Sequence, residues 1–426
     1  MMIHDLKEYV TNKTRAAKRA SAKCAIVSAA EKNQALKQMG EAIWNQRRQV
    51  FQANEKDLEN AVTNGLSSAK QDRLLITEKR LLDMIQGLNS LAEYDDPVGE
   101  VISAYQRPNG LKIEKVRVPF GVIAIIYESR PNVTADAAGL AIKAGNSVVL
   151  RGGKEAIHSN KALVSAMKDG LGQTSIPAEA IQFIERTERD SIDILIQAKD
   201  SVDLVIPRGG SGLIQRVVKQ AHVPVIETGV GNCHTYVHES ADLEMARSVA
   251  VNAKTQRPSV CNAMETLLVD KKIADRYLPQ LGKDLAAKGV KIKGCKQTCQ
   301  ILQDQKDLDL SLATDEDYAT EFLDLTLAIK VVDGLQEAVN HIGQYGTLHS
   351  EAIISEDESA TEAFLNQVDA ACVYHNASTR FTDGAEFGFG AEMGISTQKM
   401  HARGPMGLRE LTSYKYVIRG NGHVRE

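Results

Sequence analysis

Long hydrophobic runs are missing from this sequence. Its most apolar short stretch, residues 122–127, is far too short to cross a bilayer, because a membrane-spanning helix needs about 20 apolar residues. The first nine residues also lack the apolar core of a signal peptide. We therefore expect a cytoplasmic protein without a membrane segment.

Cysteine is scarce, and neither sign of charge prevails. Six cysteines in 426 residues are too few for a disulfide framework, so we expect reduced thiols. The 51 basic and 55 acidic residues give a net charge of -4, which leaves no basic patch of the kind that binds nucleic acid. The expected partner is a small molecule. Repeats and low-complexity tracts are absent too.

The length exceeds what one hydrophobic core usually supports, so two or three domains are expected. The first hundred residues are predicted to be mainly helical. Ser28 and Glu31 form a capping-box pattern, in which each side chain satisfies a free backbone N–H at a helix start. A second helix is predicted over residues 77–93, where apolar residues recur at helical spacing.

Residues 101–118 are β-prone on both sides of Pro108, Asn109 and Gly110. Asn-Gly favours a tight hairpin turn, because both residues tolerate positive φ angles. An isolated two-stranded ribbon is marginal in water. We expect it to pack on a neighbouring subunit or on the β-prone tail, residues 412–418, and to support a homodimer or a dimer of dimers.

Apolar strands then alternate with helix-like segments, which predicts an α/β fold with a doubly wound parallel sheet. The expected strands are 122–127, 147–150, 181–185, 202–206 and 223–227. A second alternation predicts another α/β domain, with strands at 235–237, 265–269, 326–332, 352–354 and 371–374. Residues 282–301 give no clear pattern.

Two Gly-rich turns follow predicted strands of the first sheet, where open α/β sheets bind nucleotides. Gly209, Gly210, Ser211 and Gly212 precede a predicted helix from Leu213, whose free N–H groups could bind a phosphate. An ordinary strand-to-helix turn is the alternative. After the strand 147–150, Arg151 and Lys154 stand where an acidic residue would read the ribose of NAD. These two cations favour the 2′-phosphate of NADPH, unless they are solvated surface residues.

Cys261 occupies a predicted loop, where a substrate could reach its thiol. Most cysteines that form no disulfide are small buried hydrophobes, and spacing alone does not separate the two possibilities. Cys295 and Cys299 are four residues apart, and Cys233 adjoins His234, but no second pair has zinc-like spacing. We expect no metal site.

Several ordered segments carry a resemblance to a known family. Residues 118–150 resemble the cofactor half of aldehyde dehydrogenases. More specifically, the chain resembles the gamma-glutamyl phosphate reductase family in the segments YESRPNVT (127–134), PRGGSGLI (207–214), ETGVGNCH (227–234), HSEAI (349–353) and FGFGAEMGISTQKMHARGPMGLREL (387–411). This resemblance implies an aldehyde-dehydrogenase-like fold. Its expected parts are a cofactor domain (1–98 and 119–229), a catalytic domain (230–396), and an oligomerisation ribbon with its tail (99–118 and 408–426).

The resemblance also implies a reaction, the NADPH-dependent reduction of L-glutamyl 5-phosphate to L-glutamate 5-semialdehyde and phosphate, on the route to proline. Cys261 would attack the acyl phosphate and form a thioester that accepts hydride. The oxyanion would be stabilised by the Cys261 backbone N–H and by the Asn132 side chain. Glu227 aligns with the base of hydrolytic relatives, but this reaction needs no water, so capping a strand end is an equal possibility.

The substrate carries two anionic groups and an ammonium. Guanidinium groups suit the two anions because they donate in a bidentate fork, and the resemblance suggests Arg130 and Arg403. The candidates for the ammonium are Glu351, Ser350 and His349.

Two other functions remain open. A coenzyme-A-acylating aldehyde dehydrogenase would use the same cysteine, but its reverse reaction would depend on coenzyme A in place of phosphate. A non-catalytic nucleotide-binding scaffold would bind the cofactor without turnover.

Overall fold

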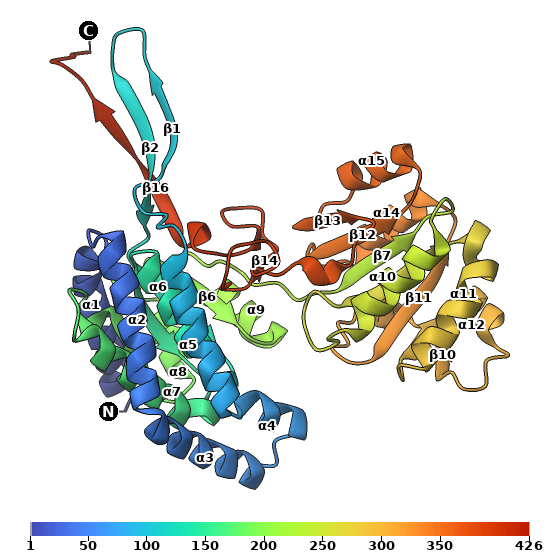
Figure 1. Ribbon diagram of the computed structural model, residues 1–426, viewed down its shortest axis with the longest axis horizontal. Coiled ribbons are helices and arrows are strands. Elements are labelled where there is room, and N and C mark those ends of the chain that lie inside the picture. The colour runs from blue at the N-terminus through green and yellow to red at the C-terminus, as the bar shows by residue number, and fades with distance from the viewer. Residues whose placement is uncertain (1, 426) are drawn as a thin grey trace. The chain divides into compact units, whose positions relative to one another are not determined.

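The computed structural model describes residues 2–425, and side chains throughout that range apart from Met2, Ile3, Ala69 and Ser211. The chain divides into two compact units, which are described separately. Unit 1 comprises Met1–Thr228, Gly388–Gly394 and Met406–Glu426. Unit 2 comprises Gly229–Phe387 and Ile395–Pro405. Both are α/β, as the sequence predicted (Figure 1).

Unit 1 begins with five helices, which confirms the helical prediction for this part of the chain. They are α1 (Met2–Cys24), α2 (Ala29–Asn45), α3 (Arg47–Thr63), α4 (Ser68–Leu74) and α5 (Glu78–Glu93). The predicted capping box is present, because the Ser28 hydroxyl accepts from the Glu31 backbone N–H and the Glu31 carboxylate accepts from the Ser28 backbone N–H. α5 starts after Thr77, whose hydroxyl accepts from the Arg80 backbone N–H.

The sheet of unit 1 is parallel and has the strand order β5-β4-β3-β6. Its strands are β3 (Val122–Tyr127), β4 (Ser147–Arg151), β5 (Ile181–Phe183) and β6 (Leu204–Arg208). The helices between them are α6 (Asn132–Lys143), α7 (Ile157–Leu171), α8 (Asp190–Ile196) and α9 (Ser211–Gln220), with the short 3-10 helices η1 (Lys154–Ala156) and η2 (Ala178–Ala180). Because β3, β4 and β5 are buried throughout, they appear in the sequence as continuous apolar runs.

The strand predicted at residues 223–227 does not form. The segment makes only a single parallel bridge, Val205 to Val225. Its two hydrogen bonds run from the Val205 N–H to the Pro224 carbonyl at 2.9 Å and from the Ile226 N–H to the Val205 carbonyl at 3.0 Å. Pro224 has no N–H to continue a ladder, and β6 is therefore the last strand of this sheet.

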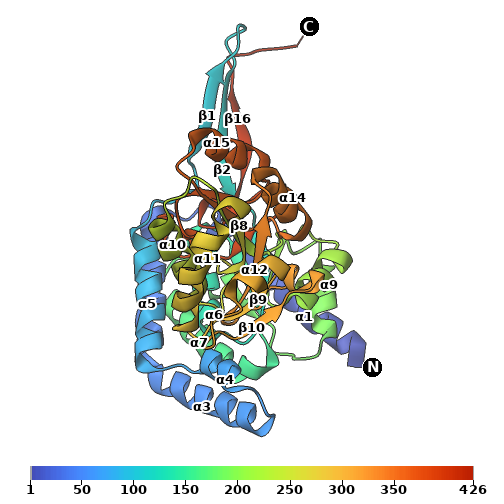
Figure 2. The ribbon, with the colours of Figure 1, turned by 90° about the vertical axis from the view of Figure 1, so that its right-hand side faces the viewer.

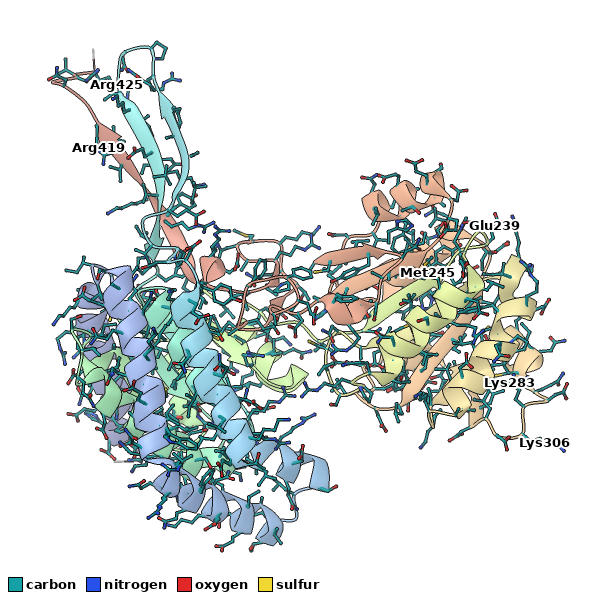
Figure 3. The ribbon with its side chains drawn as sticks, in the orientation of Figure 1. Glu239, Met245, Lys283, Lys306, Arg419 and Arg425 are labelled. Atoms are coloured by element: carbon teal, nitrogen blue, oxygen red, sulfur yellow. The ribbon has the colours of Figure 1, made fainter. Side chains whose placement is uncertain are left out.

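The predicted ribbon is confirmed, and it pairs with the tail of the same chain. β1 (Val101–Gln106), β2 (Lys112–Pro119) and β16 (Thr412–Arg419) form an antiparallel sheet in the order β1-β2-β16. β16 pairs along the whole of β2, and the Arg419 side chain, labelled in Figure 3, forms an ion pair with Glu114.

The hairpin turn differs from the predicted one. Gly110 has a positive φ of 96°, but Asn109 does not. The turn is closed by bonds from the Gly110 N–H to the Arg107 carbonyl and from the Arg107 N–H to the Leu111 carbonyl. This connection is longer than a two-residue turn and needs only one left-handed residue.

Unit 2 contains a parallel sheet with the strand order β10-β9-β11-β8-β7-β12-β13. Its strands are β7 (Cys233–Val237), β8 (Met264–Asp270), β9 (Lys291–Gly294), β10 (Leu310–Leu312), β11 (Thr326–Val332), β12 (Ser350–Ile354) and β13 (Cys372–His375). Its helices are α10 (Leu243–Thr255), α11 (Lys271–Ala286), α12 (Lys296–Leu302), α13 (Asp315–Tyr318), α14 (Leu335–Tyr345), α15 (Glu358–Gln367) and η3 (Thr379–Phe381). The five strands expected here are confirmed. β9 and β10 were missed because each is short and lies toward one edge of the sheet.

Both faces of this sheet are covered by helices. Figure 2 shows α11 and α12 in front of the sheet, on the face where Val237 and Leu267 join a core with α10 and α11. Tyr236 and Leu268 point to the opposite face and pack with α14 and α15. The middle of the sheet is therefore filled with apolar side chains, and chemistry is left to the strand ends and their loops.

Two small antiparallel strands, β14 (Ile395–Ser396) and β15 (Gly404–Pro405), pair within unit 2. The 3-10 helix η4 (Arg409–Leu411) precedes β16 in unit 1. None of the helices in residues 2–425 is long and apolar enough to cross a membrane.

Candidate active site

The predicted nucleophile and several polar residues of unit 2 gather at one edge of its sheet. Cys233 begins β7, Cys261 lies three residues before β8, and Ser350 begins β12. These three neighbouring strands are parallel, so their amino ends share one edge. The site is therefore opposite to the carboxyl edge that usually binds ligands in open α/β sheets.

Cys261 lies in the turn that connects α10 to β8, as the sequence predicted, and its side chain is half-buried. The next residue, Asn262, holds this turn in place and is 4% exposed. Its Nδ2 donates to the Thr382 carbonyl at 2.8 Å, and its carbonyl accepts from the Thr379 hydroxyl at 2.8 Å. The Arg380 guanidinium donates to its Oδ1. Hydrogen bonds from Asn262 thus hold the turn that carries Cys261 against the η3 segment.

Gly231 packs directly against the backbone of Cys261. A Cβ atom on Gly231 would lie 1.5 Å from the Cys261 carbonyl oxygen, so no side chain fits there. The Gly231 N–H donates to the Glu321 carboxylate at 2.7 Å, and the Asn232 Nδ2 donates to the Tyr318 and Tyr345 carbonyls. Glycine is required at this position because two backbone segments meet.

Cys233, the first residue of β7, contacts the backbone of Cys261. Its thiol donates to the Cys261 carbonyl at 3.2 Å and is 3.6 Å from Nδ1 of His349. Complete burial raises the pKa of the Cys233 thiol well above its usual value, and the Glu351 carboxylate acts in the same direction. Cys233 therefore stays protonated, whereas the half-buried Cys261 can be reached from solvent.

The predicted ammonium ligands lie in the interior of unit 2. His349, Ser350 and Glu351 are each 0% exposed. The strand predicted at residues 352–354 begins two residues earlier, at Ser350, because Ser350 and Glu351 pair with β13. Polar residues gave no β signal there. These side chains contact other buried groups and do not line a surface.

The side chains of His349, Ser350 and Glu351 form hydrogen bonds with neighbouring buried groups. His349 Nδ1 and the Ser350 hydroxyl are 2.8 Å apart, and the Ser350 hydroxyl is 2.7 Å from the Thr382 hydroxyl. Glu351 Oε2 accepts from the backbone N–H of His234 at 2.7 Å and lies 3.0 Å from its Nδ1. Burial lowers the pKa of His349 to about 4 and raises that of Glu351, although His234 opposes the second shift.

A buried ion pair near the site was not predicted. Lys254 Nζ is 2.5 Å from Glu265 Oε2, and both side chains are fully buried. Glu265 lies at a register shift in the pairing of β7 with β8. Such an irregularity changes the side of the sheet to which a strand residue points. Burial raises the pKa of Glu265 to about 7 against the opposing effect of Lys254. In a sequence such residues look like surface charges, so no signal distinguished them.

Arg403 belongs to unit 2 and is engaged by an acidic partner. Its Nη2 lies 2.6 Å from Asp369 Oδ1, and Lys399 Nζ lies 2.5 Å from the other oxygen of the same carboxylate. The positive charge of Arg403 is therefore compensated within the chain.

In unit 1, the predicted phosphate-binding turn lies where β6 leads into α9. The helix starts at Ser211, two residues earlier than expected, with Gly210 as its N-cap. The Gly210 N–H donates to Glu128 Oε2 at 3.1 Å. A Cβ atom on Gly210 or Gly212 would meet no atom within 4 Å, so a ligand could approach this backbone closely. The Ser211 side chain is outside the described part of the structure.

The turn at Gly209 packs against Glu128. A Cβ atom on Gly209 would lie 2.7 Å from the Glu128 carboxyl carbon. The open backbone at the start of α9 and its free helical N–H groups fit a phosphate of a nucleotide cofactor.

Arg151 and Lys154, the predicted readers of a 2′-phosphate, differ in accessibility. Arg151 ends β4 and is 7% exposed. Its guanidinium donates to the Gly152 carbonyl at 2.8 Å and the Thr187 carbonyl at 3.0 Å. Lys154 begins η1 and is exposed. Lys154 is thus the more accessible cation for a ligand.

The remaining candidates also belong to unit 1. Asn132 is the exposed first residue of α6, and its Nδ2 donates to Asp136 Oδ2 at 2.9 Å. Arg130 precedes it in the turn after β3. Glu227 is half-buried, two residues after the bridge at Val225.

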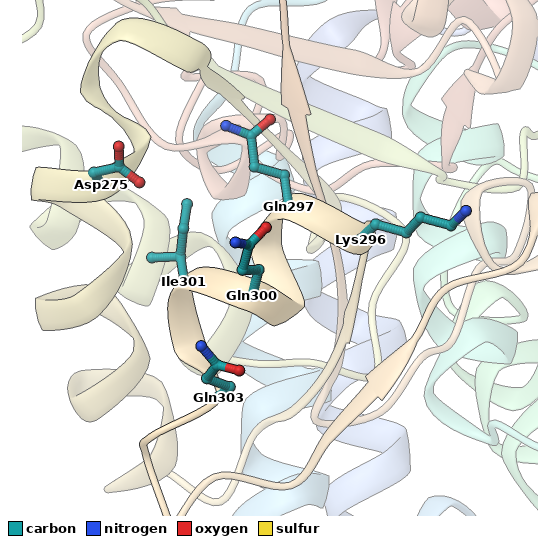
Figure 4. Close-up of a pocket in the computed structure, with 6 residues that line it drawn as sticks. All are labelled: Asp275, Lys296, Gln297, Gln300, Ile301 and Gln303. Atoms are coloured by element: carbon teal, nitrogen blue, oxygen red, sulfur yellow. The ribbon is translucent and has the colours of Figure 1, made fainter.

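One hollow on unit 2 contains none of these residues. It is formed by α12, the residue that follows it and one residue of α11, and its lining is mostly polar (Figure 4). The lining residues are Asp275, Lys296, Gln297, Gln300, Ile301 and Gln303. The part of the chain that is described has no group of three or more His, Cys, Asp or Glu side chains arranged to hold a metal ion.

Comparisons with known proteins agree with this fold. The sequence profile of the aldehyde dehydrogenase family matches residues 4–309, so the chain belongs to that family. Within it, the chain is 54% identical over 420 residues to the gamma-glutamyl phosphate reductase of Clostridium botulinum, covering 99% of this chain and 100% of the relative. The chain therefore belongs to the gamma-glutamyl phosphate reductase group of the family.

Two further relatives support this membership. The gamma-glutamyl phosphate reductase of Carboxydothermus hydrogenoformans is 55% identical over 416 residues, covering 98% of this chain and 99% of the relative. The crystal structure of the Thermotoga maritima gamma-glutamyl phosphate reductase matches with a TM-score of 0.95 at 49% identity, covering 98% of this chain and all of that one.

Proposed function

We propose that this chain is the reductase that converts L-glutamyl 5-phosphate to L-glutamate 5-semialdehyde and phosphate, with a nicotinamide cofactor, in proline biosynthesis. The observation that carries this function is the near-full-length identity to relatives named for the activity. The site agrees with it, because the half-buried thiol of Cys261 lies in a turn that Asn262 and Gly231 hold in place.

The chemistry divides into two steps at Cys261. The thiolate attacks the acyl carbon, a C–S bond forms, and the C–O bond to phosphate breaks with its electron pair on the departing oxygen. The resulting thioester is more reactive than a carboxylate. When bound, the nicotinamide cofactor supplies the hydride that reduces this thioester. The C–S bond then breaks, which releases the aldehyde and regenerates the Cys261 thiolate.

We assign the supporting roles as follows. The Cys261 backbone N–H and the Asn132 side chain donate to the oxyanion of each tetrahedral intermediate. Arg130 and Arg403 are the candidates for the anionic groups of the substrate, and Arg403 would have to exchange its partner Asp369 for the substrate. Glu227 has little catalytic weight, because no water needs activation.

His349, Ser350 and Glu351 were predicted as ligands of the substrate ammonium. The complete burial of all three, and the contact of His349 with Cys233, whose thiol donates to the Cys261 carbonyl, favour a supporting role in the interior next to the nucleophile. We therefore assign these three side chains to positioning the loop of Cys261.

We further propose that the cofactor is NADPH. Gly209, Gly210, Ser211 and Gly212 would bind its diphosphate at the start of α9, and Arg151 and Lys154 would favour the 2′-phosphate. The exposed side chain of Lys154 supports this preference, and Arg151 shapes the same turn through its two carbonyl contacts.

The decisive assay runs the reaction backwards. Glutamate semialdehyde should reduce NADP only when inorganic phosphate is present. Dependence on coenzyme A in place of phosphate would identify an acylating aldehyde dehydrogenase and overturn the proposal. Cofactor binding without any turnover would identify a nucleotide-binding scaffold.

Assembly into a homodimer or a dimer of dimers is the last part of the proposal. Val101, Tyr105, Tyr416 and Ile418 on the ribbon are about half exposed, and β1 has no partner on its outer side among the described strands. Such an edge invites pairing with another chain. Light scattering should show an oligomer, and deleting residues 107–110 should reduce its size. An unchanged size, or a monomeric parent at micromolar concentration, would refute this assembly.

A further inference from the structure

The Arg380 guanidinium is held beside the nucleophile by two neutral amide groups. Its Nε donates to Gln256 Oε1 at 3.0 Å, and its Nη1 donates to Oδ1 of Asn262, the residue after Cys261. Amide oxygens orient the planar guanidinium without neutralising it. The remaining N–H donors of the fork are left for another acceptor.

No acidic side chain in residues 2–425 lies within ion-pair distance of Arg380. The nearest acid in the sequence is Asp383, whose Oδ1 accepts from the Ala385 backbone N–H at 2.9 Å. A half-buried cation without a counterion is costly, so its retention beside a reactive thiol calls for a ligand that carries negative charge.

A second guanidinium belongs to the same region. Arg257 lies four residues before Cys261 in the turn after α10, and its side chain is exposed. Burial lowers the pKa of Arg380 and the charge of Arg257 lowers it further, whereas Asp383 and the thiol of Cys261 act in the opposite direction. The two guanidinium groups therefore interact electrostatically with each other and with the nucleophile.

Arg403 offers a contrast within unit 2. Asp369 neutralises it at 2.6 Å and is itself shared with Lys399. Arg380 forms no ion pair within residues 2–425 and is bonded to the residue next to Cys261. Of these two arginines, Arg380 is the one prepared to meet an anion at the reacting centre.

We infer that Arg380, assisted by Arg257, binds the phosphate group of the acyl phosphate substrate and the inorganic phosphate that leaves it. This inference rests on the proposed function. In an acyl phosphate, one oxygen joins phosphorus to the carbon that Cys261 attacks, whereas the α-carboxylate lies at the far end of the substrate. A cation beside Cys261 therefore meets the phosphate. The guanidinium also stabilises the charge that collects on phosphate as the C–O bond breaks.

The test measures saturation of the reverse reaction with inorganic phosphate. Arg380→Gln removes the charge, Arg380→Lys keeps the charge without the fork, and Arg257→Gln alters only an exposed side chain. Arg247→Gln is the matched control, because this arginine of α10 pairs with Asp284 and Glu244. In the Arg380→Gln variant the KM for phosphate should rise about tenfold or more, with the Kd for NADP and the KM for semialdehyde unchanged.

The other variants should change the KM for phosphate less, or leave it unchanged. Arg380→Lys and Arg257→Gln should give smaller increases in the KM for phosphate, and Arg247→Gln should leave each constant within about twofold of the parent. An unchanged KM for phosphate in Arg380→Gln would overturn the inference. So would an increase that falls on the semialdehyde, because Arg380 would then bind the carboxylate.

Thiol alkylation gives a readout that does not depend on turnover. Inorganic phosphate should slow alkylation of Cys261 by iodoacetamide in the parent, and Arg380→Lys and Arg257→Gln should weaken this protection. If the parent is protected by phosphate but fails to reduce NADP, the proposed function is wrong and the anion subsite stands. If NADP is reduced in a phosphate-dependent reaction but phosphate gives the parent no protection, the subsite is wrong and the function stands.

Discussion

The contact between Gly231 and Cys261 allows a sharp test of how the nucleophile is positioned. In a Gly231→Ala variant, the new Cβ atom would start 1.5 Å from the Cys261 carbonyl oxygen, 2.3 Å from its carbon and 2.7 Å from Cα. An ordinary contact begins at 3.4 Å, so the two segments must separate by roughly 2 Å. Both partners are backbone, and neither can rotate away as a side chain would.

This displacement should damage catalysis more than stability. A misplacement of about 1 Å at a reacting centre can cost ~100-fold in rate, so we expect kcat to fall by about 100-fold or more. Overpacking of this kind typically costs about 1–3 kcal/mol of unfolding free energy. The move would also disrupt the bond from the Cys233 thiol to the Cys261 carbonyl.

The assay compares Gly231→Ala with Gly343→Ala. Gly343 lies in α14, where a Cβ atom would meet no atom within 4 Å, so alanine should leave activity intact and add up to ~1 kcal/mol of helix stability. Phosphate-dependent reduction of NADP, the rate of Cys261 alkylation and thermal unfolding would be measured for both variants. Parental kcat and parental alkylation rate in Gly231→Ala would refute the reasoning.

Three more predictions concern the two thiols, the cofactor site and His341, a buried residue of α14. Cys261→Ala should abolish turnover while the melting temperature and cofactor binding stay intact. Cys233→Ala should keep most activity, because it removes only a weak S–H donor. Equal losses of activity in both variants would mean that the thiols are wrongly ranked. Lys154→Gln should weaken NADPH much more than NADH in fluorescence titrations, and a parallel loss would show that Lys154 does not read the 2′-phosphate. Burial lowers the pKa of His341 from 6.5 to about 3, so below pH 6.5 the unfolded chain binds a proton that the folded chain refuses, and stability falls by ~1.4 kcal/mol per pH unit. In urea unfolding between pH 6.5 and 4, His341→Phe should reduce the pH dependence of stability by this amount, while His349, whose pKa burial lowers to about 4, keeps its own contribution. An unchanged pH dependence would contradict the assignment.

Much of the fold could be predicted because its strands are buried on both faces. β3 and β11 appear as apolar runs, and their prediction was confirmed. β9 failed because Lys291, Lys293 and Gly294 leave a single apolar residue in it. Residues 223–227 were wrongly predicted as a strand because most of their side chains are β-prone. The prediction gave too little weight to Pro224, which cannot donate to a ladder.

The site was harder to predict from the sequence, because its contacts join distant parts of the chain. Asn262 and Thr382 are 120 residues apart, and Gly231 and Glu321 are 90 apart, so no local pattern connects them. Cys261 itself could be identified only through family resemblance, since spacing alone did not separate it from buried cysteines. Arg380 and Lys254 look like solvated surface charges until the fold shows their surroundings.

The candidate functional groups of the two units lie at opposite ends of their respective parallel strands, and this has a chemical reason. In unit 1 the Gly-rich turn follows the carboxyl end of β6, where the start of α9 provides free N–H groups for a phosphate. In unit 2 the thiol of Cys261 precedes the amino end of β8, where the turn is held by side chains and by Gly231, with no Gly-rich helix start. An anion at that edge must be met by side-chain cations, and Arg380, which is held by two neutral amide oxygens, fits this role. A thiol supported within its own unit should also keep its reactivity toward alkylating reagents when no cofactor is present.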